Sequence, residues 1–353
     1  MFFLYVVIIT VLIALYVIKF AVFPLPIAKA FKMLLSAFIL LSSQSIGLGF
    51  LLSSIFPVLN TEVGMAVLGF CFSFVLFLFL STLALNLLAF VGVFAPLYSA
   101  FALAFILSVV GVFLAVRVPN VKTISLDFGL NKPFKLVQLS DLHIGSGFTH
   151  KWLEKVVEKT NALSPDAIVI TGDLIDGTPD RLMPELQSLK KLKAPVYFIY
   201  GNHEYYYGLE KWKNEWAKLN LNLLENQSVD LGAIIIGGVG MPGANAFGAK
   251  APNISETFFG SDPQKPKILL AHYPELFNNA ALAGVRLQLS GHTHGGQLFW
   301  PLNILTKRAN AGYLKGTYYK DGAMLYVSSG TGLWGGLPLR MGTTPEITLF
   351  ILK

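Results

Sequence analysis

The first 117 residues carry almost no charge, and this feature limits the possible folds more than any other. Their charged side chains are Lys19, Lys29, Lys32, Glu62 and Arg117. A helix of about 20 apolar residues spans the hydrocarbon core of a bilayer. The sequence therefore predicts an all-helical transmembrane module, residues 1–117, with four spans near 2–18, 33–58, 63–92 and 96–116. Because only a short segment separates the last two stretches, three or five spans remain alternatives.

Residues 118–353 have the composition of a water-soluble domain. These 236 residues contain 23 basic and 19 acidic side chains, and they are numerous enough to bury a substantial core. No dense basic run accompanies the modest positive charge, so we expect no nucleic-acid partner. The only cysteine, Cys71, lies in an apolar stretch and excludes a disulfide framework.

The distribution of basic residues bears on the side of the membrane that this domain faces. Lys19, Lys29 and Lys32 lie in the first loop, which the positive-inside rule assigns to the cytoplasm. With four spans, the domain then lies on the extracytoplasmic face of the cytoplasmic membrane. Arg117 and Lys122 follow the last span and favour the opposite side. The spans contain no ionisable residue of the kind that transport requires, so we interpret them as a multi-pass anchor.

Short β-rich runs alternate with amphipathic helices after residue 118. The predicted strands are 134–140, 166–171, 195–200, 267–271, 285–290 and 323–329. The predicted helices are 150–163 and 180–192. This alternation is typical of an α/β domain whose sheet is covered by helices on its faces. Fewer helices separate the later strands, which predicts a second, partly antiparallel sheet.

Five of these strands run directly into short polar motifs. The motifs are DLH at 141–143, GDLID at 172–176, GNHE at 201–204, His272, and GHTH at 291–294. The carboxyl ends of strands in an open α/β sheet gather along one edge, where ligands bind. Five of the six histidines would meet there, and only His150 stands apart. The glycines at 172, 201 and 291 would allow the backbone to approach a ligand closely.

The spacing and chemistry of these motifs favour a metal site. Side chains at positions i and i+2 of an extended chain point to the same side, which applies to Asp141 with His143 and to His292 with His294. Carboxylate, carboxamide and imidazole ligands without thiolate suit manganese, iron or zinc better than magnesium alone. Two ions about 3.5–4 Å apart are a common device for displacement at phosphorus. A lone DLH or GNHE is more typical of an ordinary loop than of a metal site, and a single His272 is more typical of a core histidine.

The motif set resembles the calcineurin-like metallophosphoesterases over roughly residues 133–352. "GHTHGGQLFWP" and the tail "GTGLWGGLPLRMGTTPEITLFIL" are similar to a membrane-associated bacterial branch of that family. The resemblance implies a four-layer αββα sandwich with a dinuclear metal site. It also implies hydrolysis of phosphodiester or pyrophosphate bonds by a metal-activated water. The transmembrane helices lie outside the region of resemblance.

The resemblance assigns a role to each polar residue of the motifs. One divalent ion, manganese before iron, zinc or magnesium, would be bound by Asp141, His143, Asp173 and His294. The other would be bound by Asp173, Asn202, His272 and His292. His203 would protonate the leaving oxygen or hold the phosphate, and with Asp173 it forms the predicted catalytic pair. Asp176 and Glu204 either orient histidines or are ordinary loop acids.

Aromatic residues accompany the metal motifs, notably Phe299, Trp300 and Trp334. They could belong to the core, or they could form an apolar wall that binds a lipidic part of the substrate. We therefore expect a membrane-anchored phosphoesterase whose partners are the bilayer and a phosphoester, lipid-linked in preference to soluble, with no protein partner. A cytoplasmic domain would suit hydrolases of lipid A synthesis, and an outward-facing one would suit envelope phospholipids or teichoic-type polymers. The alternative is a non-catalytic membrane scaffold or sensor that binds metal or ligand through the same fold.

Overall fold

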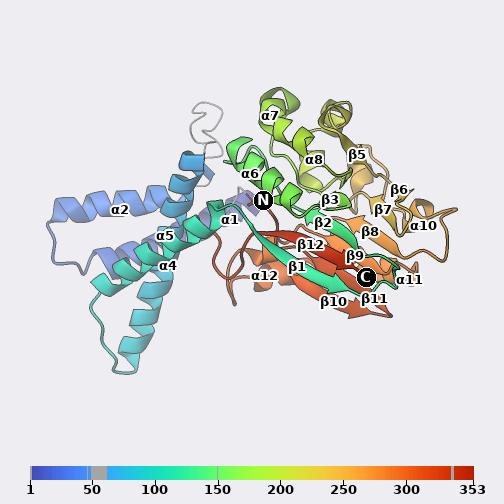
Figure 1. The fold of residues 1–353 in the computed structure, drawn as a ribbon. Helices are drawn as coiled ribbons and strands as arrows, with labels where there is room; N and C mark the ends of the chain where they lie inside the picture. Colours follow the sequence, from blue (N-terminus) through green and yellow to red (C-terminus); the bar gives the residue numbers. More distant parts are fainter. Residues whose placement is uncertain (1, 46, 49–61, 149, 335–337) are drawn as a thin grey trace. The chain divides into compact units, whose positions relative to one another are not determined.

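The chain forms two compact units in a computed structural model. The model describes residues 2–45, 47–48, 62–148, 150–334 and 338–353. The helical unit comprises Met1–Val116 together with Gly335–Met341. The sandwich unit comprises Arg117–Trp334 together with Gly342–Lys353. Each unit has its own core and is described separately (Figure 1).

The helical unit consists of long apolar helices. They are α1 (Phe2–Val17), continued by the π-helical turn Ile18–Val22, α2 (Lys29–Ser43), α4 (Glu62–Phe90) and α5 (Tyr98–Val116). Within the described residues, three segments are long and apolar enough to cross a membrane: Tyr5–Val22, Val63–Phe90 and Tyr98–Val116. Helix α2 is shorter, and residues 46 and 49–58 of the predicted second span lie outside the described part of the chain.

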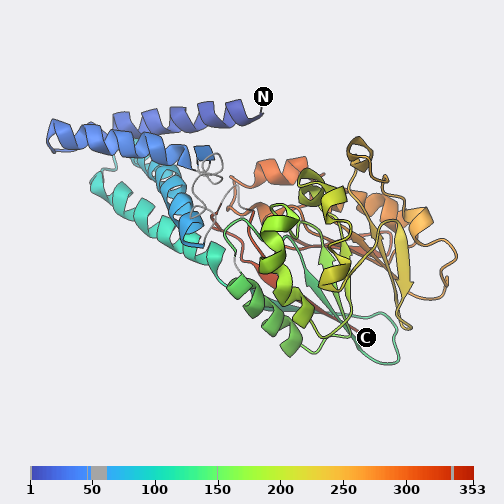
Figure 2. The same ribbon diagram turned by 90° about the horizontal axis from the view of Figure 1, so that it is seen from above.

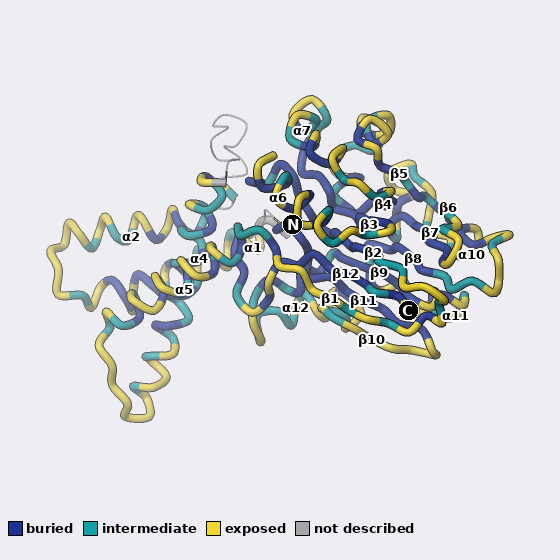
Figure 3. Tube along the Cα trace, in the orientation of Figure 1, coloured by how far each residue is buried: buried dark blue, intermediate teal, exposed yellow. Residues whose placement is uncertain are grey.

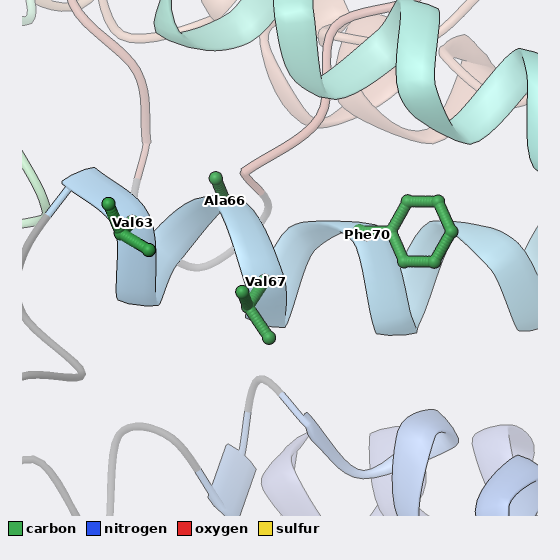
Figure 4. A pocket seen from close by; sticks show the side chains of 4 residues that line it. All are labelled: Val63, Ala66, Val67 and Phe70. Atoms are coloured by element: carbon green, nitrogen blue, oxygen red, sulfur yellow. The ribbon is translucent and has the colours of Figure 1, made fainter.

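Small residues allow the helices of this unit to pack closely. Helix α4 lies along α5, and α1 lies beside α2 (Figure 2). The buried stripe of α5 is Ala100, Ala104, Ser108, Gly111 and Ala115. The chain around Arg340 packs on this stripe, since its backbone N–H donates to the carbonyl of Gly111 at 3.1 Å. A shallow pocket of about 390 Å³ along the start of α4 has only apolar lining residues: Val63, Ala66, Val67 and Phe70 (Figure 4).

The sandwich unit contains two six-stranded mixed sheets. The first has the order β1-β12-β2-β3-β4-β5, and the second has the order β10-β11-β9-β8-β7-β6. The strands of the first are β1 (Asn120–Leu126), β12 (Glu346–Leu352), β2 (Phe134–Leu139), β3 (Ala167–Thr171), β4 (Val196–Ile199) and β5 (Leu221–Leu223). Those of the second are β10 (Gly316–Lys320), β11 (Ala323–Val327), β9 (Leu287–Ser290), β8 (Lys267–Ala271), β7 (Ile235–Val239) and β6 (Gln227–Asp230).

All six predicted strands are present, as β2, β3, β4, β8, β9 and β11. The second sheet is partly antiparallel as expected, through the pairs β6–β7 and β10–β11. The strands that were not predicted are β1, β5, β6, β7, β10 and β12. The last of them, β12, lies between β1 and β2 and runs antiparallel to β2. The predicted helix 180–192 divides into α7 (Pro179–Leu186) and a 3₁₀ segment (Gln187–Lys191).

Alternating apolar side chains hold the layers together. In β8, Ile268 and Leu270 belong to the core that joins the two sheets. Their neighbours Leu269 and Ala271 belong to the outer cluster under α10 (Ile254–Thr257) and α11 (Phe277–Leu282). Successive strand residues point to opposite faces, so one apolar run serves both clusters.

Helices cover the outer faces of both sheets. Helices α6 (His150–Ala162) and α7 lie beside the first sheet, whereas α10 and α11 lie beside the second (Figure 1). The central strands of both sheets are buried between them, whereas the edge strands β1, β6 and β10 are largely exposed (Figure 3). The predicted four-layer αββα sandwich, preceded by apolar helices, is therefore confirmed.

Candidate metal centre

The polar motifs meet where the carboxyl ends of two stacked sheets come together. The motifs after β2, β3 and β4 come from the first sheet, and those after β8 and β9 come from the second. The expectation from the sequence was that all five motifs gather along the edge of a single sheet. Two edges close the site from both sides, so the donor groups are buried.

Five of the seven predicted ligands have left-handed backbone conformations. Their φ angles are +53° for Asp141, +47° for His143, +51° for Asp173, +68° for His292 and +50° for His294. The expectation that these pairs share a side because the chain is extended was wrong, since the loops turn sharply at each of these residues. Non-glycine residues adopt this conformation rarely, and such strain is concentrated at functional sites.

Three groups of side chains could each hold a metal ion, because within each group the donor atoms all lie within 4.8 Å of one another. The groups are Asp141, His143 and His294; Asp173, His272 and His292; and His143, Asp176 and His203. The first two groups match the division of ligands predicted for the two ions. Asp173 lies between them, because its Oδ2 is 3.7 Å from His143 Nε2 and 3.2 Å from His272 Nε2. The assignment of individual ligands stays a prediction.

The outer hydrogen bonds of two histidines leave Nε2 directed at the carboxylates. His143 Nδ1 donates to Asp176 Oδ1 at 3.0 Å, and His272 Nδ1 donates to the carbonyl of Thr171 at 2.8 Å. Metal-binding histidines are held in this way, with the outer nitrogen bonded to a carboxylate or carbonyl. His143 Nε2 faces His294 Nε2 at 3.1 Å. Adjacent ligand atoms of an ion bound at about 2.1 Å are about 3–4 Å apart, so these donors fit two divalent ions.

Asp176 links a predicted ligand to the predicted acid. Its Oδ1 accepts hydrogen bonds from His143 Nδ1 and from His203 Nδ1. Burial opposes ionisation of Asp176, but the two histidines outweigh it and hold the pKa of this carboxyl below its usual value. Of the two roles considered for Asp176, the structure places it where it orients histidines.

The two remaining histidines of the site differ in charge. Burial alone would lower the pKa of His203, but the carboxylates of Asp173 and Asp176 outweigh it and raise the pKa to about 10. Burial lowers the pKa of His292 to about 3, and the neighbouring His272 adds to this effect. The two carboxylates thus favour the protonated form of His203, whereas burial favours the neutral form of His292.

Glu204 has a different role from the one predicted. It is fully buried, and its carboxylate accepts hydrogen bonds from four backbone N–H groups. These donors belong to Asp173, Leu174, Ile175 and Gly201. Glu204 therefore fixes the backbone that carries Asp173, and it is neither a histidine partner nor an exposed loop acid.

Two glycines make room for the carboxylates themselves. A Cβ at Gly201 would lie 2.2 Å from Asp173 Oδ1, and one at Gly291 would lie 2.3 Å from Asp141 Oδ2. The prediction was that these glycines let the backbone approach a ligand. The structure shows that they let the backbone approach the carboxylates of the site.

Several polar residues around the centre were missed. Tyr273 donates from its hydroxyl to Asn202 Oδ1 at 3.3 Å and packs its ring 4.1 Å from that of His292. Beneath the site, Thr171 donates to Ser140 Oγ at 2.8 Å, and Ser140 donates to Asp141 Oδ2. Tyr273 follows His272 directly, so its position was the one available signal. The hydroxyls in the strands had none.

The predicted aromatic residues lie on the surface of the sandwich unit. Trp300 is 73% exposed, Trp334 is 43% exposed and Phe299 is 37% exposed. Trp334 donates its backbone N–H to Gln297 Oε1 at 3.2 Å, which ties it to the loop that follows His294. Exposure of this size excludes a core role for Trp300.

Comparisons with known proteins agree with this geometry. The family model for calcineurin-like phosphoesterases matches residues 134–296. An uncharacterized metallophosphoesterase of Campylobacter jejuni is 37% identical over 244 residues, covering 68% of this chain and 64% of that protein. A transmembrane protein with metallophosphoesterase domain from Bos taurus is 34% identical over 270 residues, covering 70% of this chain and 60% of that protein. The chain thus spans less than two thirds of the length of these two relatives.

A third relative matches over nearly its whole length. An uncharacterized metallophosphoesterase of Aquifex aeolicus is 31% identical over 251 residues, covering 68% of this chain and 92% of that protein. The three apolar helices and the bovine transmembrane relative indicate a membrane protein. The fold, the buried Asp and His donors and these similarities lead to one conclusion: the chain belongs to the calcineurin-like metallophosphoesterase family.

Proposed function

We propose that this protein is a membrane-anchored, two-metal phosphoesterase that hydrolyses phosphodiester or pyrophosphate bonds of a lipid-linked substrate. The observation that supports it best is the pair of buried Asp and His clusters joined by Asp173. Four of the five histidines of the site lie within 4 Å of a carboxylate oxygen, which is the spacing of ligands that surround shared ions. A non-catalytic scaffold that binds metal would share these donors, so turnover distinguishes the two candidates.

The donor set suits a divalent ion of the manganese type. Asp141, His143, Asp173 and His294 would hold one ion, and Asp173, Asn202, His272 and His292 would hold the other. When bound, two such ions polarise the phosphoryl oxygens and lower the pKa of water. We propose manganese as the resident metal, because nitrogen and oxygen donors occur together without sulfur.

His203 is the proposed proton donor. Its side chain is 14% exposed, and Asp176 accepts from its Nδ1, so Nε2 is the nitrogen that would face a substrate. Its Nε2 lies 3.9 Å from Asp173 Oδ2, next to the donor clusters. A protonated imidazole there can donate to the leaving oxygen as the ester bond breaks.

Exposed apolar side chains on two sides of the centre are the reason for proposing a lipidic substrate. After the GHTH motif, Trp300 is 73% exposed and Leu305 of α12 (Ile304–Ala309) is 76% exposed. Beside His203, Tyr206 is 61% exposed, and its ring is tilted against that of Phe247 with 6.0 Å between the ring centres. Apolar surface next to a polar site binds an acyl chain more readily than a small soluble ester.

The catalytic proposal is tested on the full chain in detergent, stripped of metal and reloaded with Mn²⁺. We expect metal-dependent hydrolysis of an aryl phosphodiester, and a fall of at least about 100-fold in Asp173→Asn. Asp321→Asn, an exposed acid of the loop after β10, is the matched control and should keep full turnover. Failure of the loaded protein to cleave diester or pyrophosphate bonds would contradict the proposal and favour the scaffold.

The lipid preference needs its own comparison. We expect Trp300→Ser to raise the KM for a phospholipid-type diester by about tenfold and to leave the soluble aryl diester unchanged. Tyr319→Ser, 76% exposed on β10, controls for the loss of any surface aromatic. Equal effects on both substrates, or no preference of the unaltered enzyme for the lipid, would remove this part of the proposal.

A further inference from the structure

The sandwich unit has a second hollow at the other end of its strands. This cavity of about 760 Å³ is formed by the loop before β2, the loop before β8 and the turn before β9. Its charged lining residues are all basic: Lys132, Lys265, Lys267 and Arg286. No acidic side chain lines it among the residues that the structure describes.

The cavity is separate from the metal centre. Lys267 begins β8, whereas His272 follows the last residue of that strand. At about 3.3 Å per residue, five residues of strand separate the two by about 17 Å. A ligand in this cavity therefore does not contact the metal-binding side chains.

Arg286 is already held in position. Its Nη2 donates to the backbone carbonyl of Asp127 at 2.6 Å, and its guanidinium lies 4.8 Å from the ring centre of Phe128. A guanidinium carries five N–H donors in a rigid plane, so this arrangement leaves donors for a second acceptor. A pre-positioned arginine loses little entropy when it binds an anion.

The three lysines that line the cavity differ in how far a neighbouring acidic group balances their charge. Lys265 Nζ lies 2.6 Å from Asp230 Oδ2, so its charge is largely balanced. Lys267 Nζ lies 5.5 Å from the ring centre of Phe258, and Lys132 is exposed at the mouth of the cavity. Among the described residues, these three cations, Lys132, Lys267 and Arg286, have no acidic side chain within 4 Å, and they surround one space.

We propose that this cavity is a second binding site, for a ligand that carries one or two phosphate groups. Arginine and lysine together are the usual partners of phosphate, and the volume lies in the range of small-molecule sites. The ligand could be a free phosphorylated molecule or the headgroup of an anionic lipid. This site does not depend on the metals or on the proposed hydrolysis.

Pyrophosphate binding to the metal-free full chain in an uncharged detergent tests the proposal. We expect saturable binding at one site, measured by calorimetry after chelation and buffer exchange. The double variant K267Q/R286Q should weaken binding at least about tenfold. Lys132→Gln changes only an exposed side chain, so it should fold normally and weaken binding about threefold.

A matched control separates a site from general attraction. K211Q/K213Q removes two exposed lysines elsewhere on the sandwich unit and should leave the affinity unchanged. Absence of saturable binding, or an equal loss in this control, would overturn the proposal. Retained binding in both Lys132→Gln and K267Q/R286Q would overturn it as well.

Short-chain lipids below their micelle concentration identify the source of the phosphate. Competition by dihexanoyl phosphatidylglycerol but not by the phosphatidylcholine analogue would assign the site to an anionic headgroup. Competition by neither lipid, with pyrophosphate binding intact, would assign it to a soluble phosphorylated molecule.

Discussion

The two ends of the strands in the sandwich unit differ in the burial of their charged side chains and in their backbone conformation. At the carboxyl ends, Asp141 and His143 are fully buried and their backbone is left-handed. At the amino ends, Lys132 and Arg286 are exposed around an open cavity. Buried charges require partners and a fixed backbone, whereas cations in water require neither. Left-handed non-glycine residues also occur elsewhere in the domain, as at Ser164 and Asp321, but five of them gather at the end that would hold metal.

The largest effect is expected where the backbone touches a carboxylate. In Gly291→Ala, the new Cβ would lie 2.1 Å from Ser140 Oγ and 2.3 Å from Asp141 Oδ2, so Asp141 must move. Displacement of a catalytic group by about 1 Å costs roughly 100-fold, and we expect at least that loss of turnover. Gly260→Ala, where a Cβ would meet nothing within 4 Å, is the control. Gly260 has φ +71°, so its alanine variant is strained without a collision, whereas Gly291 lies outside the left-handed region; equal losses in the two variants would mean that the collision with Asp141 is not the cause.

Metal removal should loosen one end of the sheets and spare the other. At a free metal concentration of about 100 times Kd, binding contributes about 2.7 kcal/mol, or roughly 5–10 °C in Tm. Thermal unfolding with and without chelator measures this shift. Hydrogen exchange should accelerate at the N–H groups of Asp141 and His143 but not at that of Lys135, which donates to Asp166 Oδ2 at 2.7 Å. An equal acceleration of exchange at Lys135 would contradict this contrast between the two ends of the strands.

Carboxylates that hold backbone groups occur at both ends and should differ in importance. Glu204→Gln replaces a buried acceptor of four backbone N–H groups, and we expect the free energy of unfolding to fall by about 2–3 kcal/mol. Asp166→Asn changes an exposed acceptor that water can replace, so the loss should be much smaller. Chemical denaturation of both variants gives the two values. A larger loss of stability for Asp166→Asn would contradict the view that the buried hydrogen bonds at the carboxyl ends of the strands contribute more.

The smallest effect is expected from the residue that only orients histidines. Asp176→Asn should lower metal affinity and turnover by about 10–100-fold, because His143 and His203 lose a charged acceptor. The control is Glu185→Gln, whose partner His150 is exposed and 3.4 Å away, and it should behave like the unaltered protein. Metal titration by calorimetry separates the loss of affinity from the loss of turnover. Full affinity in Asp176→Asn would show that the histidines keep their orientation without it.

Local patterns explain why so much of the fold was predicted from sequence. The apolar runs of β3 and β8 are short, buried and followed by polar motifs, so both the strand and the site residue after it are visible locally. The apolar run of β12 is also visible locally, but its place between β1 and β2 is not, because these neighbours are remote in sequence. The role of Glu204 was mistaken for the same reason, since its hydrogen bonds reach residues about 30 positions away.

The sequence by itself determined the α/β class, and it predicted the two-part organisation and the set of donor side chains, because each depends on neighbouring residues. Only the tertiary structure decided how the donors face one another. His143 meets Asp176 across 33 positions of the chain and His294 across 151. The tertiary structure also placed Lys132, Lys267 and Arg286 around one cavity, which no sequence motif indicated. Contacts between distant segments depend on how the sheets stack, and sheet stacking leaves no local pattern in the chain.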